Sequence, residues 1–298
     1  MVRSLADPYP IIQALKRIAL RMDEAGAMRL GALLGGLAYH LSGFRRRVAA
    51  ENVSHAIQHI RRRNPSASPG RIVRACFVNL GKNLIEFLRI PLLNDENLFE
   101  KIKPCGLERI YRSLERGRGV ILFIPHLGNW ELLAPFYGAT LDRKAVIAFP
   151  LKSPRLDELV RSHRSRFGLE IIPKRGALRR AVKLLRRNYV VGFLADQDAG
   201  RSGVFIDFLG RPASWERAPV ALALRTGAAL HISADVRMPD DTHRAIASEP
   251  IELVITGDFE RDVRLNTEAV VRAVEELICR YPDQWLWIHR RWKTQPQG

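Results

Sequence analysis

The sequence has 298 residues, of which 47% are hydrophobic, and a formal net charge of +17 at pH 7. This length is ample for one large domain with a sizeable core, or for one domain with a helical appendage, and the hydrophobic fraction is typical of a globular protein. The strong positive charge favours a partner that carries phosphate, which includes nucleic acid, an anionic bilayer and an anionic substrate. Composition alone does not choose among these three.

The cysteines exclude two common kinds of scaffold. Cys76, Cys105 and Cys279 are odd in number, far apart and without any Cys-x-x-Cys pair, so neither a disulfide framework nor a zinc site is expected. Each is flanked by apolar residues, which predicts buried free thiols in a reducing compartment. No early stretch combines the charged, apolar and small-residue segments of a secretory signal, and we therefore expect the chain to stay in the cytoplasm.

Residues 1–100 predict helices only. Apolar residues recur at helical spacing in residues 10–22 and 71–90. Residues 28–44 are apolar but interrupted by an arginine and a histidine, so they fall short of the roughly 18 to 20 apolar residues that a spanning helix needs. Arginines follow at once, at positions 45–47, and the pattern predicts an interfacial helix with a basic collar. The alternative is a buried core helix followed by a solvated run of charge.

From residue 101 onward, apolar strands alternate with helical segments. The predicted strands cover residues 120–124, 145–149, 170–172, 189–195 and 230–236. The predicted helices cover residues 107–116, a segment after 130, and residues 156–167, 177–188 and 218–225. This alternation predicts an α/β fold, a mostly parallel sheet covered by helices over residues 101–298, behind a helical, membrane-associating subdomain of residues 1–100. Residues 244–255 are expected to add a pair of edge strands, and Thr267 to cap a final helix.

The stretch from residue 118 to residue 133 carries the strongest functional signal. Val120 to Ile124 is an unbroken apolar run, which predicts a strand buried on both faces, and the proline after it ends the strand. His126 therefore follows a strand end, where open α/β sheets place their chemistry. Glu131 comes five positions later; on one continuous helix the two side chains would lie about 140° apart. Because a Gly128–Asn129 turn separates them, we expect the Glu131 carboxylate to return to the imidazole.

The His-x4-Glu spacing of His126 and Glu131 resembles the catalytic motif of the glycerolipid-type acyltransferases. Within that group, the chain is most similar to the bacterial branch that includes the late acyltransferases of lipid A biosynthesis and the phosphatidylinositol mannoside acyltransferases. Further stretches resemble the same branch in order and separation: Ala-Asp-Gln-Asp at 195–198, Gly-Val-Phe-Ile-Asp-Phe-Leu-Gly-Arg-Pro at 203–212, Leu-Arg-Thr-Gly at 224–227, and a tryptophan-rich tail at 281–292. The similarity spans most of the chain.

This resemblance implies acyl transfer from a thioester to a hydroxyl. Histidine is a common general base at neutral pH, and His126 would take that role while Glu131 holds the other ring nitrogen and fixes the tautomer. Because a thiolate leaves readily, the family mechanism needs no covalent acyl-enzyme. No metal or cofactor is expected beside the co-substrate, which is acyl carrier protein in its acylated form (acyl-ACP) or acyl-coenzyme A (acyl-CoA). The alternative for His126 is a ring that satisfies a backbone carbonyl at the strand end.

Three polar residues follow the predicted strand 189–195 and should share the sheet edge with His126. Asp196, Gln197 and Asp198 are assigned to shaping the acceptor site. Two carboxylates could hold a divalent metal, but the sequence shows no fixed ligand spacing, and the resemblance implies a metal-independent enzyme. The structural alternative is that these acids hold neighbouring loops or cationic side chains.

Four further residues complete the predicted substrate site. Arg164 and Arg166 end a predicted helix, and the resemblance implies an arginine-bearing helix that holds a phosphate or headgroup. Because they are two positions apart they point in different directions, so only one need face the site, and Arg164 is preferred. The alternative is a solvated basic helix end. Asn129, in the turn, and Arg211 are also assigned to substrate binding.

The sequence therefore predicts a membrane-associated acyltransferase that moves a fatty acyl chain from acyl-ACP or acyl-CoA to a hydroxyl of a glycolipid, first of all a lipid A precursor. A phosphatidylinositol mannoside, a lysophospholipid and water (a thioesterase) are alternative acceptors. The alternative of another class is a basic, non-enzymatic nucleic-acid-binding protein, but no zinc-finger, RNP or basic-zipper pattern supports it, so no nucleic-acid partner is expected. The expected location is the cytoplasmic face of the bacterial inner membrane, peripheral or monotopic, with the anionic bilayer surface as a partner.

Overall fold

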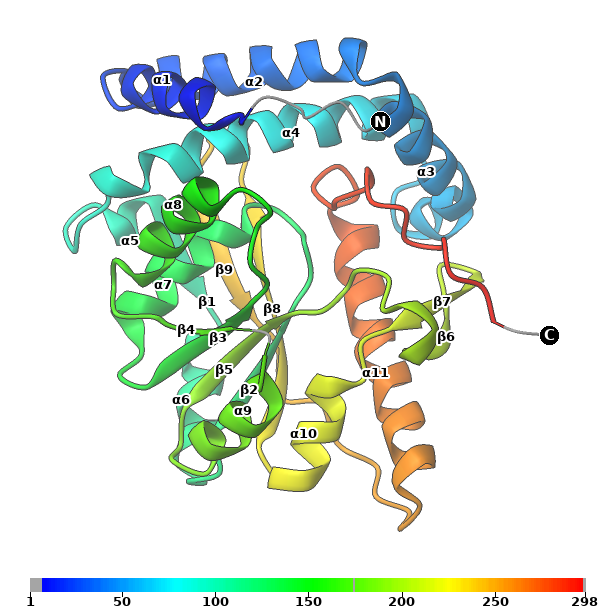
Figure 1. Cartoon of the computed structure of the whole chain (residues 1–298). Helices are drawn as coiled ribbons and strands as arrows, with labels where there is room; N and C mark the ends of the chain where they lie inside the picture. The colour runs from blue at the N-terminus through cyan, green and yellow to red at the C-terminus, as the bar shows by residue number, and fades with distance from the viewer. Residues whose placement is uncertain (1–6, 174, 297–298) are drawn as a thin grey trace.

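The computed structural model describes residues 7–173 and 175–296, and Figure 1 shows a sheet covered by helices, with a helical layer across one end. Within these residues, the main sheet has seven strands: β1 (Ile102–Cys105), β2 (Val120–Ile124), β3 (Lys144–Ala148), β4 (Glu170–Pro173), β5 (Val190–Leu194), β8 (Ala229–Arg237) and β9 (His243–Ala247). Their order is β1-β9-β8-β2-β5-β3-β4. Every neighbouring pair is parallel except β8 and β9, so the predicted α/β class with a mostly parallel sheet is confirmed.

Strand β2 occupies the middle of the sheet and joins its two cores. All five of its residues are buried, as the apolar run predicted. Ile121 and Phe123 belong to the core on one face, and Val120, Leu122 and Ile124 belong to the core on the other. Because successive side chains of a strand point to opposite faces, one apolar run fills both cores and fixes where the carboxyl end of β2 lies.

Helices follow the strands as the alternation predicted. They are α6 (Leu107–Leu114), η2 (Trp130–Leu132) continuing into α7 (Leu133–Thr140), α8 (Pro154–Ser165), α9 (Ala177–Leu185), η3 (Gly200–Ser202), α10 (Ala218–Thr226) and α11 (Phe259–Arg280). The predicted cap of the last helix is wrong. Helix α11 begins after Asp258, whose carboxylate accepts hydrogen bonds from the Glu260 and Arg261 amides at 3.1 Å. Thr267 lies inside the helix, and its hydroxyl donates to the Val263 carbonyl.

The predicted pair of edge strands within residues 244–255 is also wrong. The segment supplies one strand, β9, and that strand is interior, between β1 and β8. The short and largely polar β1 (Ile-Lys-Pro-Cys) covers its outer edge, and no apolar pattern marked β1 in advance. A second, two-stranded sheet, β6 (Val204–Phe208) with β7 (Arg211–Trp215), was not predicted.

The helical prediction for the first third is confirmed over the described residues before β1. The helices are α1 (Tyr9–Ala19), α2 (Glu24–Leu41), α3 (Gly43–Arg63), α4 (Pro69–Arg89), η1 (Ile90–Leu92) and α5 (Leu98–Lys101). Helix α4 runs beneath α1 and α2, across the end of the sheet (Figure 1).

Helices α2 and α4 meet with almost no side chain between them. A Cβ atom on Gly35 would lie 2.2 Å from the Phe77 carbonyl oxygen, and one on Gly81 would lie 2.2 Å from the Gly31 carbonyl oxygen. The glycines therefore let the two backbones touch. This contact explains why a helix-forming segment carries so many glycines.

The opposite face of α2 is exposed and apolar. Leu33, Leu37 and Leu41 recur every four residues on that face, and Leu41 is 82% exposed. The alternative of a buried core helix is therefore wrong, because only the face toward α4 is buried. No helix among residues 7–173 and 175–296 is long and apolar enough to cross a membrane.

The cysteine prediction holds for two of the three thiols. Cys76 and Cys279 are buried and free, and burial raises the pKa of the Cys76 thiol to about 12. Cys105 is also free but exposed, contrary to the prediction. The difference arises because Cys105 lies on β1, at the outer edge of the sheet.

Candidate active site

His126 lies just past the carboxyl end of β2, as predicted, and is held by Asp196. Strands β2 and β5 are parallel neighbours, with Ile124 opposite Leu194, so the residues that follow them meet at one edge. The His126 Nδ1 atom lies 2.5 Å from Asp196 Oδ1, and the His126 amide donates to Asp196 Oδ2 at 2.9 Å. The placement of Asp196 at the sheet edge with His126 is confirmed.

The Asp196 carboxylate is buried and ionised. It is 2% exposed, and Trp285 Nε1 donates to its Oδ2 at 2.8 Å. Burial by itself would raise the pKa of Asp196, but the charge and hydrogen bonds of His126, with the bond from Trp285, outweigh it and lower the pKa below its ordinary value. An ionised carboxylate at Nδ1 requires a proton on that nitrogen, which leaves Nε2 as the ring atom able to accept a proton.

Glu131 does not contact the imidazole, so the expected His126–Glu131 bond is absent. Its oxygens instead bind Arg164 of α8, at 2.8 Å from Nε and 2.6 Å from Nη2. The reason is local: the chain enters the tight turn of η2 directly after Asn129, and Trp130 packs against His126 with ring centroids 4.9 Å apart. The turn directs the next side chain toward α8, and Asp196 takes the place beside Nδ1.

Arg164 faces the site and Arg166 does not, which agrees with the preference for Arg164. Arg164 lines both the cleft beside His126 and a neighbouring apolar pocket, whereas Arg166 is exposed at the end of α8. Arg164 is already bound by Glu131 through two bonds. Within the described structure its position is therefore set by a carboxylate of this chain.

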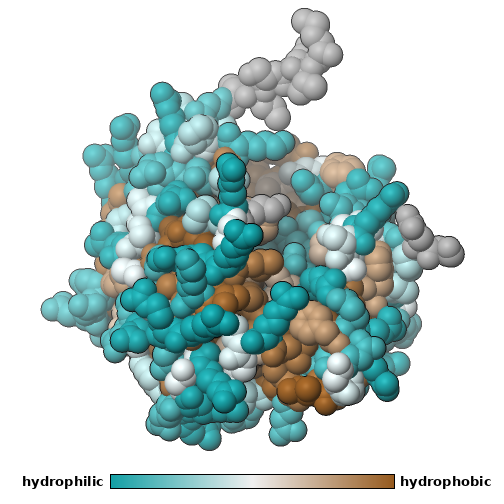
Figure 2. Space-filling model, turned by 60° about the horizontal axis from the view of Figure 1, so that its bottom comes forward, coloured by the Kyte–Doolittle hydropathy of each residue, from teal (hydrophilic) through white to brown (hydrophobic). Residues whose placement is uncertain are grey.

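The cleft beside His126 has a volume of about 650 Å³. Its lining combines exposed apolar side chains with polar ones: Phe149, Leu151, Leu178, Arg164, Gln197 and Asp198. A narrow apolar pocket adjoins it, shares Arg164 and Leu194 with it, and is lined mainly by Leu122, Ile124, Leu133, Tyr137, Val146 and Gly192. Figure 2 shows a face on which hydrophobic surface gathers around a hollow, with hydrophilic side chains around it.

The other predicted residues separate into those at the cleft and those elsewhere. Gln197 lines the cleft, with its Nε2 3.4 Å from His126 Nε2. Asp198 lies at the cleft wall and binds the tail, accepting from Thr294 Oγ1 at 2.9 Å, as its structural alternative predicted. Arg211 begins β7 and does not line the cleft.

Two features of the site were not foreseen. His289 accepts a hydrogen bond from the Asp198 amide at 3.2 Å, and burial, together with nearby cations, lowers its pKa to about 4, although Asp196 opposes this. The tryptophan-rich tail was the sequence signal that could have pointed to His289. Trp285, in the same segment, is buried against Asp196. The second feature is a buried ionic network beneath the turn after His126.

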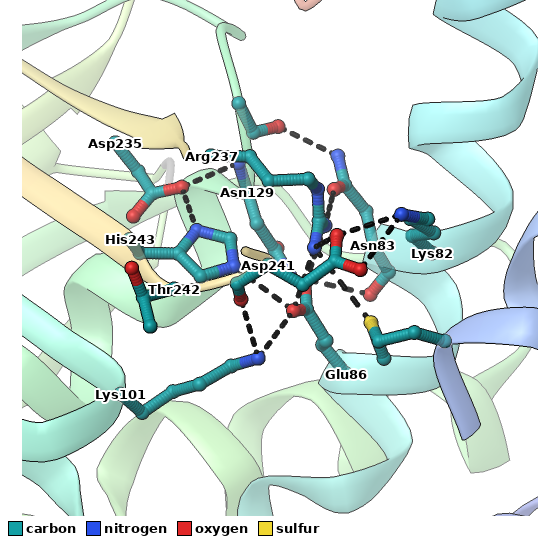
Figure 3. A network of polar contacts seen from close by, with 12 residues as sticks. Lys82, Asn83, Glu86, Lys101, Asn129, Asp235, Arg237, Asp241, Thr242 and His243 are labelled. Carbon is teal, nitrogen blue, oxygen red and sulfur yellow. Dashed lines mark hydrogen bonds and ion pairs between the residues drawn. The ribbon is translucent and has the colours of Figure 1, made fainter. Parts of the chain in front are cut away.

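The turn at Gly128 and Asn129 is fixed from below by this network (Figure 3). Asn83 of α4 donates to the Gly128 carbonyl at 2.6 Å, and the Asn129 amide donates to Asp235 Oδ2 at 2.8 Å. The Asn129 side chain donates to Glu86 at 2.8 Å, so Asn129 is buried in the network and does not face the cleft as assigned. Gly128 has φ +62°, and a Cβ there would lie 2.0 Å from the Asp235 carbonyl oxygen. These contacts therefore hold the backbone beside His126 in a single conformation.

Two carboxylates in the network enclose His243 of β9. Its Nδ1 lies 2.7 Å from Asp235, and its Nε2 lies 2.9 Å from Glu86, which also binds Arg237 through two bonds. Burial disfavours a charged imidazole, but the two carboxylates outweigh burial and raise the pKa of His243 to about 9. The ring is therefore a buried cation at neutral pH.

We expect the charge of His243 to make the protein less stable in alkali. Because its pKa of about 9 lies above the ordinary value of 6.5, the stabilisation is complete below pH 6.5 and is lost as pH rises through about 9. The loss should reach up to about 3 kcal/mol in the free energy of unfolding. Urea unfolding of wild type and His243→Asn between pH 6.5 and 9.5 measures it. Plotted against pH, the free energies of unfolding of wild type and His243→Asn should converge as pH rises. Parallel plots for these two proteins would contradict the prediction, whereas the exposed control His40→Asn should stay parallel to wild type.

Comparison with known proteins assigns the chain to a family. A family model described as "Bacterial lipid A biosynthesis acyltransferase" matches residues 12–294. The lipid A biosynthesis lauroyltransferase of Escherichia coli is 26% identical over 98% of this chain and 88% of its own length. A phosphatidylinositol mannoside acyltransferase of Mycobacterium tuberculosis is 29% identical over 76% of this chain and 72% of its own. The match takes in the whole sheet edge that carries His126, and the protein therefore belongs to the bacterial lipid A biosynthesis acyltransferase family and is an acyltransferase.

Proposed function

We propose that this acyltransferase moves a fatty acyl chain from a thioester, acyl-ACP or acyl-CoA, to a hydroxyl of a glycolipid. The observation that supports this most is the geometry of His126. Its Nδ1 is occupied by a buried carboxylate, and the ring lines a cleft that continues into an apolar pocket. A base, a cleft that carries polar side chains and an apolar extension are what transfer of a fatty chain to a hydroxyl requires.

In the proposed reaction, His126 Nε2 accepts the proton of the acceptor hydroxyl as its oxygen attacks the thioester carbonyl. Asp196 holds the Nδ1 proton and stabilises the imidazolium that forms. The tetrahedral intermediate then collapses, the carbon–sulfur bond breaks, and the proton on Nε2 passes to the leaving thiolate. The product is an ester and a free thiol, and no cofactor beside the donor takes part.

The acceptor that we propose first is a lipid A precursor. The lipid A biosynthesis lauroyltransferase aligns with 98% of this chain, whereas the phosphatidylinositol mannoside acyltransferase aligns with 76%. A mannosylated phosphoinositide is the second candidate, because that relative is the more similar of the two where it aligns, with 29% identity against 26%. A non-enzymatic nucleic-acid binder no longer needs consideration, since the family is one of enzymes.

We further propose that the end of the molecule formed by α1 and α2 rests on the cytoplasmic face of an anionic inner membrane. The exposed apolar side chains at this end belong to α1, α2 and the start of α3: Ile11, Ile18, Leu33, Leu37, Leu41 and Phe44. Exposed arginines lie among them, at Arg17, Arg21, Arg29, Arg45 and Arg47. Apolar side chains within a basic collar suit the boundary between headgroups and acyl chains.

The test is a transfer assay with purified protein and detergent-solubilised lipid. Labelled acyl-ACP and acyl-CoA are each offered with a lipid A precursor and with a mannosylated phosphoinositide. We expect labelled glycolipid with one of the two acceptors and none from His126→Ala. Free fatty acid in every tube, still dependent on His126, would make the protein a thioesterase, and no turnover with any pair would contradict the proposal.

We expect Glu131→Ala to lower transfer by about 10²-fold, because Arg164 loses the carboxylate that holds it and a side chain at the cleft moves. Arg164→Ala should cause a similar loss. Steady-state rates of both variants and of the double variant measure the coupling. If the two residues act as a pair, the double variant is no worse than either single one, and losses that multiply would contradict the pairing.

A further inference from the structure

Helix α9 presents a row of cations on one face. Arg179, Lys183 and Arg186 are all exposed and stand four and three positions apart, which places them on one side of the helix. None of the three forms an ion pair with a carboxylate of the described residues. The neighbouring Arg180, by contrast, is bound to Glu170 at 2.9 Å. From Arg179 to Arg186, the C-cap of the helix, the row spans eight residues, or about 10 Å.

This row begins at the cleft that holds His126. Ala177 and Leu178, in the first turn of α9, line that cleft, and Leu178 is 52% exposed. The cations then lead away from the cleft along the helix. An exposed apolar side chain at an opening, followed by a charged ridge, is the arrangement of a protein-docking surface with an electrostatic rim.

The row lies at the end of the molecule opposite to the proposed membrane surface. In Figure 1, α1 and α2 form one end, and α9 lies toward the other. A bilayer in contact with Leu33, Leu37 and Leu41 therefore leaves α9 free for a partner from the aqueous side. The anionic partner of α9 is then not the lipid on which α1 and α2 rest.

We propose that the face of α9 formed by Leu178, Arg179, Lys183 and Arg186 is the docking surface for an acidic acyl carrier protein, whose thioester arm enters the cleft beside Leu178. This rests on the proposed function and selects the donor within it. The charges on a convex helix form a line about 10 Å long, which matches an extended acidic surface of a protein. The phosphates of coenzyme A would instead need converging donors in a pocket.

The experiment reverses two charges of the row in the full-length protein, as Arg179→Glu with Lys183→Glu. The KM for acyl-ACP is expected to rise about tenfold or more, with kcat unchanged and with the KM for acyl-CoA unchanged, because rim charges act on encounter and not on the chemical step. The matched control is Arg261→Glu with Arg264→Glu, two exposed cations on α11 away from the cleft. A milder variant, Arg179→Ala with Lys183→Ala, should shift the KM for acyl-ACP in the same direction by a smaller factor.

Fluorescence anisotropy with labelled carrier protein gives a second readout that does not depend on turnover. Binding should weaken in the α9 variants, more at low salt than at high salt, and stay unchanged in the α11 control. An unchanged KM and unchanged binding would overturn the proposal while wild-type transfer still upheld the proposed function. An equal rise in KM for both donors would also overturn it. So would variants that lose binding to anionic phosphatidylglycerol vesicles and keep their binding to the carrier protein. Absence of transfer by wild type would instead count against the proposed function, with anisotropy still deciding on the surface.

Discussion

The His126→Ala variant is expected to lose acyl transfer by about 10²- to 10⁴-fold while keeping its fold. The chemical reason is that no other group in the described structure stands where Nε2 does, between Asp196 and the cleft. The structural reason is that Asp196 keeps its bonds to the backbone amide of residue 126 and to Trp285. Initial rates with saturating donor, together with thermal unfolding of the same samples, measure both parts.

The outcome is read against the unfolding temperature. A variant with normal unfolding and full activity would remove His126 from the mechanism. A variant that is inactive and unfolds early would be explained by misfolding, and His126→Asn, which keeps a polar side chain beside Asp196, then decides. We expect His126→Asn to unfold like wild type and to be equally inactive.

Asp196→Asn should lower kcat by a comparable factor, about 10²- to 10⁴-fold, although the side chain keeps its shape. Asp196 Oδ2 accepts from two donors, the His126 amide and Trp285 Nε1, so the asparagine oxygen would take this position. Its NH2 group would then face Nδ1, which must become an acceptor. The ring proton would move to Nε2, and the base would be blocked.

The measurement for Asp196→Asn is the split between kcat and KM. Donor and acceptor KM values should stay near those of wild type, because the carboxylate is buried behind the ring and does not line the cleft. Asp95→Asn, an exposed acid on the loop before α5, serves as the matched control. A kcat within threefold of wild type would show that the tautomer is not set by Asp196.

The parts of the fold that local chemistry determines could be predicted from the sequence. The apolar run Val120–Ile124 is β2 to the residue, because an unbroken apolar run of this length suits a strand that is covered on both faces. Long amphipathic helices such as α4 were also predicted within two residues. Thr267 misled the prediction because threonine is a good cap, but Asp258 stands nine residues earlier and begins the helix first.

The partner of His126 could not be predicted from spacing. Glu131 is near in sequence, and a turn allowed it to reach the ring, but the direction of a side chain in η2 depends on packing that spacing does not encode. Asp196 is 70 residues away, and its sheet-edge position was predicted, yet only the pairing of β2 with β5 brings it to Nδ1. The exposure of Cys105 was missed for the same reason, because β1 is placed at the sheet edge by its pairing with the distant β9. The β6–β7 hairpin is a local pairing, and the sequence analysis did not mark it.

The glycine contact between α2 and α4 has a consequence for how this chain tolerates change. At Gly31, Gly35 and Gly81 even one added methyl group would meet backbone, which cannot rotate away as a side chain can. A saturation mutagenesis screen should therefore find positions far from any chemistry that accept no replacement, on a helix whose outward leucines exchange freely with other apolar residues. Tolerance along α2 would alternate with the turn of the helix, and the intolerant side would trace where the two helices touch.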